Sequence, residues 1–525
     1  MSAGAARGGR LNGVKLPLSA IKNAEEEREL LRQAVSKKGG GRDFVILRKS
    51  LDAREHGRLS YVYNVGWGAA AQPLALAVGN SWRGPQPLIV GAGPAGLFAA
   101  YALALAGARP VVLEQGRDVE RRAEDVQRFW RDGVLDASSN IQFGEGGAGA
   151  FSDGKLTARN RDKLTARVFD VFIACGADPS IAYWHKPHLG SDRLPLIVAN
   201  LRRQIIAQGG EFRYQSRLTD IESAGGRLCA ISVSDGASER QLEAQTLILA
   251  TGNGARGVYR MLARRGVAMQ AKAFAVGLRI EQEQALIDAA QYGSEAGHPL
   301  LGAADYQLSY QDHRRRRGCY TFCNCPGGYI VNAASAPDGV LVNGVSEAAR
   351  DSGRANAAVV AQVVPGREFG TGPLDGLDYQ QRLERAAFAA GGGGHGLPVQ
   401  SAAAFCGEAE QEISERFQPR TAAWRRAELA EILGEDISGS IADALRHWQQ
   451  QLRGFCQGAV LAAVESRTSA PLRILRGDDR QALNLRGLYP AGEGAGYAGG
   501  IISSAADGLK TALAVIEAKR QHTLG

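Results

Sequence analysis

The chain has 525 residues, more than one hydrophobic core usually supports, so we expect two or three domains. Its 45% hydrophobic and 22% charged residues are ordinary for a globular protein, and its 67 glycines form clusters without a repeat, which excludes collagen-like and solenoid proteins. The net charge of +8 is diffuse, and no aromatic residues alternate with the basic ones, so no nucleic-acid-binding surface is expected.

The N-terminal sequence MSAGAARGGRLNGVKLPL lacks the apolar core of about 7 to 15 residues that a secretory signal contains. The seven cysteines are odd in number and scattered, which does not indicate a disulfide framework. Both features predict a cytoplasmic protein.

Residues 10–75 predict a small α+β domain. An apolar stretch at 10–18 precedes a charged helical pattern at 24–38, and alternating runs at 43–50 and 58–66 are typical of strands. Gly and Pro residues at 76–85 indicate a linker. We therefore expect a first domain at 1–84.

Residues 86–107, QPLIVGAGPAGLFAAYALALAG, predict a short strand, a glycine turn and an alanine-rich helix. In this arrangement Gly91 permits the tight turn, Gly93 lets backbone approach a pyrophosphate, and Gly96 lets helix and strand pack closely. The segment is nearly the ~20 residues that a membrane span needs, but its glycines and prolines exclude that interpretation. The pattern predicts a dinucleotide bound at the helix N-terminus.

An acid, Glu114, follows about 20 residues later at the end of the next expected strand, ARPVVLEQG. It is placed to accept the ribose hydroxyls, with Gln115 beside it. An acid at this point argues against a bound 2′-phosphate.

The segment LEAQTLILATGNGARGVYRML predicts a strand that ends at Ala250, Thr251 and Gly252 and leads into a helix. Gly252, Gly254 and Gly257 also spell GxGxxG, so a separate NAD(P)H site is an alternative. We favour a strand that completes the first nucleotide domain, because no acid follows at the ribose distance.

Residues 262–460 have mixed strand and helix patterns and predict an inserted substrate or cap domain. The chain then returns with LYPAGEGAGYAGG, where a strand meets a second glycine cluster and a final helix begins near Gly500. Three distant segments, 91–96, 250–252 and 492–500, thus converge on one elongated ligand. FAD explains this discontinuity better than a nicotinamide nucleotide does.

The expected fold class is therefore α/β. A Rossmann-like FAD-binding domain with a parallel sheet is formed by 85–261 and 461–525, an α+β substrate domain is inserted between them, and the small α+β domain precedes both.

Several strings make the chain resemble the two-domain FAD oxidoreductases of glutathione-reductase type, and more narrowly a family of FAD-dependent dehydrogenases of bacteria and plastids whose reactions are undefined. The strings are SLDAR at 50–54, NIQFGEGGAGAFSDGKL at 140–156, KPHLGSDRL at 186–194, YTFCNCPGGYIVNA at 320–333, VESRTSAPLRILR at 464–476 and YPAGEGAGYAGGI at 489–501.

The resemblance implies that the turn at 91–96 and Glu114 hold the ADP part of FAD, and that Gly492 and Glu493 lie at the ribityl and pyrophosphate groups. Many relatives carry Gly-Asp where this chain has Gly492-Glu493, and His where it has Asn253, to which we assign no role. The candidate cofactor residues are Gly91, Gly93, Pro94, Ala95, Gly96, Glu114, Gln115, Arg122, Gly144, Glu145, Gly146, Gly147, Leu218, Ala250, Thr251, Gly252, Gly492, Glu493, Gly500 and Ile501.

The glycine-rich loop at 143–155 is interpreted as a flavin-lining loop that donates N–H groups, with a surface loop as the alternative. Cys319, Cys323 and Cys325 follow as C-x3-C-x-C. Ordinary buried thiols are one explanation; a Cys323–Cys325 dithiol that contacts flavin or substrate is another, and a metal site is a third, although the spacing matches no usual zinc or iron–sulfur signature.

His188 is a candidate acid/base or flavin-contact residue, with a structural hydrogen-bonded histidine as the alternative. A His185–His188 metal pair is disfavoured because Pro187 lies between them.

We expect an FAD-dependent oxidoreductase that passes a hydride or an electron pair between flavin and a small organic substrate, with NAD(P)H considered as a transient donor. A flavin monooxygenase and a flavin-bearing binding or sensor protein are the alternatives. The block Arg314, Arg315, Arg316 and Arg317 is read as a solvated loop, with docking of an anionic or protein partner as the alternative.

Overall fold

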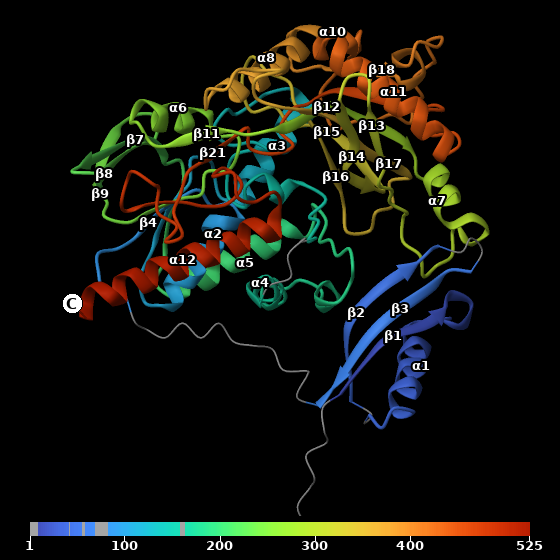
Figure 1. Ribbon diagram of the computed structural model, residues 1–525, viewed down its shortest axis with the longest axis horizontal. Coiled ribbons are helices and arrows are strands. Elements are labelled where there is room, and N and C mark those ends of the chain that lie inside the picture. The colour runs from blue at the N-terminus through green and yellow to red at the C-terminus, as the bar shows by residue number, and fades with distance from the viewer. Residues whose placement is uncertain (1–8, 41–42, 55–57, 69–81, 158–162, 525) are drawn as a thin grey trace, which may run out of the picture.

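The computed structural model describes residues 9–40, 43–54, 58–68, 82–157 and 163–524. Figure 1 shows three parts: a parallel sheet with its helices, a mixed sheet beside it, and the N-terminal unit below the mixed sheet. The predicted α/β fold with a Rossmann-like parallel sheet is confirmed.

The parallel sheet has the strand order β22-β10-β4-β5-β6. Its strands are β4 (Leu88–Val90), β5 (Val111–Leu113), β6 (Glu211–Arg213), β10 (Leu247–Leu249) and β22 (Leu488–Pro490). Four of them, all but β6, are continuous runs of buried residues, because both faces of this sheet are covered.

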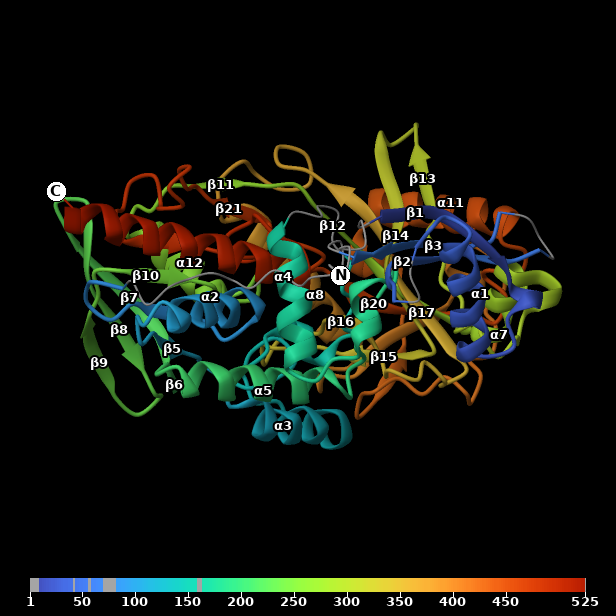
Figure 2. The same ribbon diagram turned by 90° about the horizontal axis from the view of Figure 1, so that it is seen from below.

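One face of the parallel sheet carries helices, which Figure 2 shows side by side. These are α2 (Pro94–Leu105), α3 (Val119–Asp132), α4 (Lys163–Ala174), α5 (Leu194–Ala207) and α12 (Ile501–Leu524). The other face packs against α6 (Arg256–Arg264) and the antiparallel sheet β7 (Arg217–Ala224), β8 (Arg227–Ser234) and β9 (Glu239–Glu243).

The mixed sheet has the order β13-β14-β17-β12-β20-β18-β19 and a largely antiparallel pairing. Its strands are β12 (Phe274–Glu283), β13 (Ser309–Asp312), β14 (Arg317–Pro326), β17 (Arg354–Val363), β18 (Leu397–Ser401), β19 (Trp424–Arg426) and β20 (Val460–Glu465). A hairpin of β15 (Gly328–Asn332) and β16 (Val342–Ser346) lies beside it.

Helices α8 (Asp375–Ala390), α10 (Leu429–Leu433) and α11 (Glu435–Gln451) cover one face of the mixed sheet, at the top of Figure 1. The helices α7 (Gln284–Tyr292) and α9 (Ala402–Phe405) follow β12 and β18 along the chain. The chain leaves the parallel-sheet part through β11 (Met269–Ala271) and returns to it through β21 (Leu472–Ile474), which pairs with β11. The mixed-sheet part is therefore an insertion in the chain.

The N-terminal unit is a sheet of β1 (Gly9–Pro17), β3 (Ser60–Trp67) and β2 (Val45–Asp52) covered by α1 (Ala24–Ser36). Both predicted strands and the predicted helix are present, and the apolar stretch at 10–18 forms a third strand. Most of the predicted linker at 76–85 lies outside the described residues.

Lys49 on β2 joins the N-terminal unit to the rest of the molecule. Its N–H donates to the carbonyl of Tyr183 at 2.8 Å, and the N–H of His185 donates to its carbonyl at 2.9 Å. Its ammonium group pairs with Glu27 at 2.8 Å and lies 4.9 Å from the ring centroid of Trp184. Backbone pairing and a partly buried cation thus fix the orientation of this unit.

Helices α2 and α12 cross in close contact because small residues meet at the crossing. A Cβ atom on Gly508 would lie 2.0 Å from the carbonyl oxygen of Ala95, and one on Gly492 would lie 2.7 Å from the Cβ of Ala95. Ala95 therefore fits between two glycines of the C-terminal segment.

We expect Gly508→Ala to lower the free energy of unfolding by about 2 kcal/mol, because the added methyl group forces α12 away from α2. The matched control is Gly257→Ala on α6, where a Cβ would meet nothing within 4 Å; there we expect a change below about 1 kcal/mol. Urea denaturation measures both, and equal stabilities of the two variants would contradict this account of the crossing.

Candidate functional site

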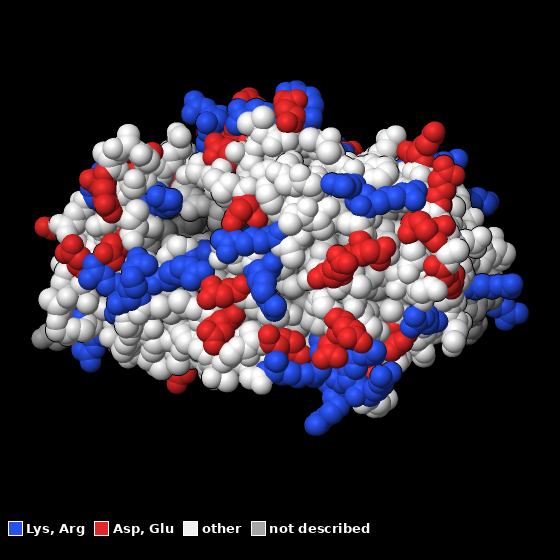
Figure 3. Space-filling view, turned by 90° about the horizontal axis from the view of Figure 1, so that it is seen from above, with Lys and Arg blue, Asp and Glu red and all other residues white. Residues whose placement is uncertain are grey.

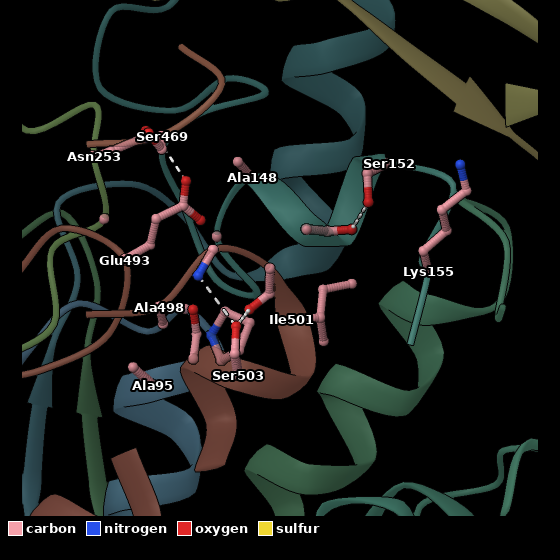
Figure 4. Close-up of a pocket in the computed structure, with 18 of the residues that line it drawn as sticks. Ala95, Ala148, Ser152, Lys155, Asn253, Ser469, Glu493, Ala498, Ile501 and Ser503 are labelled. Atoms are coloured by element: carbon pink, nitrogen blue, oxygen red, sulfur yellow. Dashed lines mark hydrogen bonds between the residues drawn. The ribbon is translucent and has the colours of Figure 1, made fainter. Parts of the chain in front are cut away.

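A cavity of about 1610 Å³ lies where the parallel sheet, the mixed sheet and the N-terminal unit meet. Its wall includes Gly91 before α2, Gly500 before α12, Cys323 on β14 and Leu47 on β2. Figure 4 shows part of this wall, with Ala95 and Ile501 at the starts of the two helices. One cavity thus receives residues from all three parts of the fold.

Backbone contacts at glycines hold the three predicted segments together. A Cβ on Gly91 would lie 2.3 Å from the carbonyl oxygen of Ala250, and one on Gly494 would lie 2.4 Å from that of Gly252. The hydroxyl of Tyr259 donates to the carbonyl oxygen of Gly494 at 2.8 Å. Segments 91–96, 250–252 and 492–496 therefore pack backbone against backbone.

A second group of glycines faces open space instead. A Cβ on Gly252, Gly499 or Gly500 would meet nothing within 4 Å, and one on Gly93 would meet only the Cα of Gly147, at 3.7 Å. All of these glycines line the cavity. Their missing side chains leave space through which a ligand can reach the backbone.

The N-termini of α2 and α12 both border the cavity. The first N–H groups of a helix have no partner within the helix, and the helix dipole favours negative charge at this end. Two such ends on one cavity suit an anionic group such as a pyrophosphate.

Glu114 lines the cavity and also organises the glycine loop above α2. Its carboxylate accepts the N–H groups of Ala92 at 2.8 Å, Gly116 at 2.9 Å and Gly144 at 3.0 Å. The N–H of Gly146 donates to the carbonyl of Ala92 at 2.8 Å. The loop that begins at Gly144 is therefore held directly over the turn at 91–96.

Most of the sequence-predicted site residues line this one cavity. They are Gly91, Gly93, Pro94, Ala95, Glu114, Gln115, Gly144, Gly147, Leu218, Ala250, Thr251, Gly252, Cys323, Glu493, Gly500 and Ile501. Gly252 and Gly254 of the second GxGxxG line the same cavity.

The remaining predicted residues do not line the cavity: Gly96, Arg122, Glu145, Gly146, His188, Cys325 and Gly492. Gly96 packs on the carbonyl of Gly91, and Gly492 packs on Ala95. These two positions serve the packing of the turn and the return segment.

Arg122 was expected to contact the cofactor, but its side chain is fully buried behind the loop. Its guanidinium donates to the carbonyls of Asn140, Ile141 and Glu145 at 2.6 to 2.8 Å. Because a Cβ on Gly144 would lie 2.3 Å from its Cδ, the loop needs glycine there. Arg122 therefore positions the loop from outside the cavity.

Glu145 also faces away from the cavity. Its carboxylate accepts the N–H of Val119, at the start of α3, at 2.9 Å and pairs with Arg202 at 2.6 Å. The carboxylate thereby ties the loop to the N-terminus of α3.

His188 lies behind the cavity wall, and its Nε2 is 3.2 Å from the carbonyl oxygen of Ala348. Burial and the nearby Arg350 lower the pKa of the His188 imidazole. His185 of the same HKPH string lines the cavity instead.

Asn253, whose role the sequence pattern does not predict, contacts the predicted cofactor residue Glu493. Its amide donates to the Glu493 carboxylate at 2.7 Å, as Figure 4 shows. Burial raises the pKa of Glu493 to about 7, and Lys272 across the wall opposes that rise. The position directly after Ala-Thr-Gly was the signal that could have identified Asn253.

Sequence reasoning also missed two buried groups at the mixed-sheet end. Glu465 at the end of β20 lines the cavity and pairs with the fully buried Arg279 of β12 at 3.0 Å. Neither Arg279 nor Glu465 stands out in the sequence, because they meet only through strand pairing.

Lys155 also lines the cavity. It lies on the opposite side of the cavity from Glu493 in Figure 4.

The surface of the molecule indicates a function less clearly than the cavity does. Lys and Arg are interspersed with Asp and Glu on the face in Figure 3. Arg315 pairs with Asp312 at 3.0 Å and Asp443 at 2.8 Å. The interpretation of the arginine block as a solvated loop is wrong for Arg317, which is buried at the start of β14 and pairs with Glu368 at 2.9 Å. Within the described ranges, no helix has the length and apolarity to cross a membrane, and no cluster of three His, Cys, Asp or Glu residues could hold a metal ion.

Two parts of the chain match known protein families. Residues 273–468 match the family described as "FAD-dependent protein, C-terminal domain-like", and residues 89–145 match the "NAD(P)-binding Rossmann-like domain". An uncharacterized protein of Clostridium beijerinckii is 39% identical over 529 residues, covering 97% of this chain and 98% of that protein.

Solved structures are more distant. The flavin-dependent brominase Bmp2 is 12% identical with a TM-score of 0.37, covering 84% of this chain and 80% of its own. A flavoprotein/dehydrogenase from Cytophaga hutchinsonii is 13% identical with a TM-score of 0.34, covering 84% and 79%. The OxyS anhydrotetracycline hydroxylase of Streptomyces rimosus is 18% identical with a TM-score of 0.28, and this chain spans 46% of that protein.

The raised pKa of Glu493 makes stability depend on pH. The folded chain binds a proton that the unfolded chain releases between pH 4.5 and about 7, so the free energy of unfolding should fall as the pH rises through this window. Relative to Glu493→Gln, the wild type should lose at most about 1.4 kcal/mol per pH unit there. Denaturation of the FAD-free chain at several pH values measures this loss.

The control is Glu124→Gln, at an exposed position on α3. The free energy of unfolding of this variant should change with pH in parallel with that of the wild type. Parallel profiles for Glu493→Gln and the wild type would contradict the burial argument.

Proposed function

Since this chain belongs to a family of FAD-dependent oxidoreductases, we propose that its cavity holds FAD in an extended conformation between the starts of α2 and α12. The observation that carries this proposal is the set of glycines that face open space beside two helix N-termini. Together they fit a long ligand with a pyrophosphate near its middle.

The ADP part of FAD belongs at the turn that leads into α2. There Gly93 leaves room for the pyrophosphate, and the Glu114 carboxylate accepts the ribose hydroxyls beside Gln115 and Leu218. Glu114 also accepts three backbone N–H groups, which orient the carboxylate. This arrangement, with the return strand β22 next to β10, supports the glutathione-reductase-type interpretation.

The isoalloxazine belongs on the mixed-sheet side of Thr251, Gly500 and Ile501, and Glu493 lies toward the ribityl chain. Bound FAD supplies the acceptor or donor of a hydride or an electron pair. Glu493 and Asn253 hold a hydrogen-bonded pair there, whose proton is available near neutral pH because burial raises the pKa of Glu493.

The substrate belongs at the end of the cavity formed by the inserted residues 262–460, where Tyr306, Tyr320, Phe322 and Asn343 line the wall. Aromatic faces bind a small organic molecule, and a few polar groups orient it. We therefore propose a dehydrogenase or reductase acting on such a molecule.

Anaerobic mixing of the holoprotein with NADH or NADPH tests the electron donor. Bleaching of the flavin by either nucleotide supports NAD(P)H as the transient donor. No bleaching by either would overturn that part of the proposal and assign the electrons to the organic substrate.

We expect Gly93→Val to lose FAD retention, because its side chain occupies the space that the pyrophosphate needs. Flavin absorbance per chain after addition of FAD and gel filtration measures retention. Gly257→Val, on α6 outside the cavity wall, is the control and should keep FAD. Full occupancy in a folded Gly93→Val protein would contradict the placement.

A further inference from the structure

Strand β14 is interrupted by a bulge at the cavity wall. Its pairing with β17 shifts register between Phe322 and Cys325, and Cys323 has a φ of +46°, in the left-handed region that residues other than glycine rarely adopt. Bulges of this kind redirect side chains and occur often beside active sites.

The bulge turns consecutive side chains toward one cavity. In a regular strand neighbouring side chains point to opposite faces, yet Phe322, Cys323 and Asn324 all line the cavity. Asn324 is only 7% exposed, and both polar atoms of its carboxamide lack a hydrogen-bond partner among the described residues. A buried carboxamide without partners is costly, so this part of the wall is suited to receive a polar ligand.

Cys325 is buried beside Cys323, and its thiol donates to the carbonyl oxygen of Cys323 at 3.4 Å. Arg279 holds the pair in place: its Nη2 donates to the carbonyl oxygen of Cys323 at 2.7 Å and lies 3.3 Å from the sulfur of Cys325. The hydrogen bond from the Cys325 thiol lowers the pKa of Cys323 and raises that of Cys325, and Lys155 and Arg279 add to the lowering at Cys323. Cys323 is thus prepared as a thiolate facing the cavity.

The C-x-C spacing limits how far apart these two cysteines lie. Residues two apart in a regular strand have Cα atoms about 6.6 Å apart, at the upper end of the range for a disulfide. None of the seven cysteines forms a disulfide in the structure.

We propose that Cys323 and Cys325 cycle between dithiol and disulfide and exchange an electron pair with the flavin in the same cavity; this rests on the proposed function. On oxidation a bond forms between the two sulfurs, the S–H bond of Cys325 breaks, and the flavin accepts the two electrons and that proton. The reverse step reduces the disulfide at the expense of reduced flavin.

A second pair of thiols provides a matched control. The thiols of Cys406 and Cys456 also interact, which lowers the pKa of Cys406 and raises that of Cys456. Neither lines the cavity. The proposal therefore requires flavin-linked redox chemistry at Cys323–Cys325 and none at Cys406–Cys456.

Anaerobic reductive titration of the FAD-loaded, air-oxidised protein tests the proposal, with dithionite as titrant. Full reduction of the wild type should consume four electrons per flavin, two for the flavin and two for the disulfide. Cys323→Ser and Cys325→Ser should each consume two, and a Cys406→Ser/Cys456→Ser variant should still consume four.

Alkylation and mass mapping of the same wild-type samples give a readout that does not depend on the variants. Cys323 and Cys325 should be labelled only after reduction. Two electrons per flavin in the wild type, or a drop to two in Cys406→Ser/Cys456→Ser, would overturn the inference while leaving FAD binding intact. Failure to load FAD would instead count against the proposed function.

Discussion

The fold depends on backbone contacts at a few glycines that join distant segments of the chain. Ala95 at the start of α2 fits between Gly492 and Gly508, and Gly91 packs on the carbonyl of Ala250. A side chain at Gly492 or Gly508 would separate α2 from the return segment, and one at Gly91 would separate the turn from Ala250. Because β22 and α12 close the parallel sheet and border the cavity, the site exists only when these contacts are made.

Two kinds of glycine therefore have different tasks at one site. Those that meet backbone hold the segments together, and those that face open space, such as Gly93 and Gly500, leave room for a ligand. The mixed sheet contributes the buried Arg279–Glu465 pair and the bulge at Cys323 to this end of the cavity. The proposed electron exchange between Cys323 and the flavin therefore requires both parts of the chain.

Much of this could be predicted from the sequence, because the relevant signals are local. The turn at 91–96, the acid at Glu114 and the start of α12 near Gly500 are each written in a few neighbouring residues. Arg122 is predicted to contact the cofactor but lies behind the loop instead. Its burial depends on the carbonyl groups of residues 140–145, and no local sequence pattern reveals these contacts. The Asn253–Glu493 contact and the β14 bulge likewise arise from long-range packing and strand register, for which the sequence has no short signature.

A single FAD site assembled from distant segments of the chain can be tested by hydrogen exchange of the backbone amides, with and without FAD. We expect FAD to slow exchange together at 91–97, 143–149 and 492–504, which meet at the cavity. Protection confined to 91–97, with no change in the C-terminal segment, would contradict it.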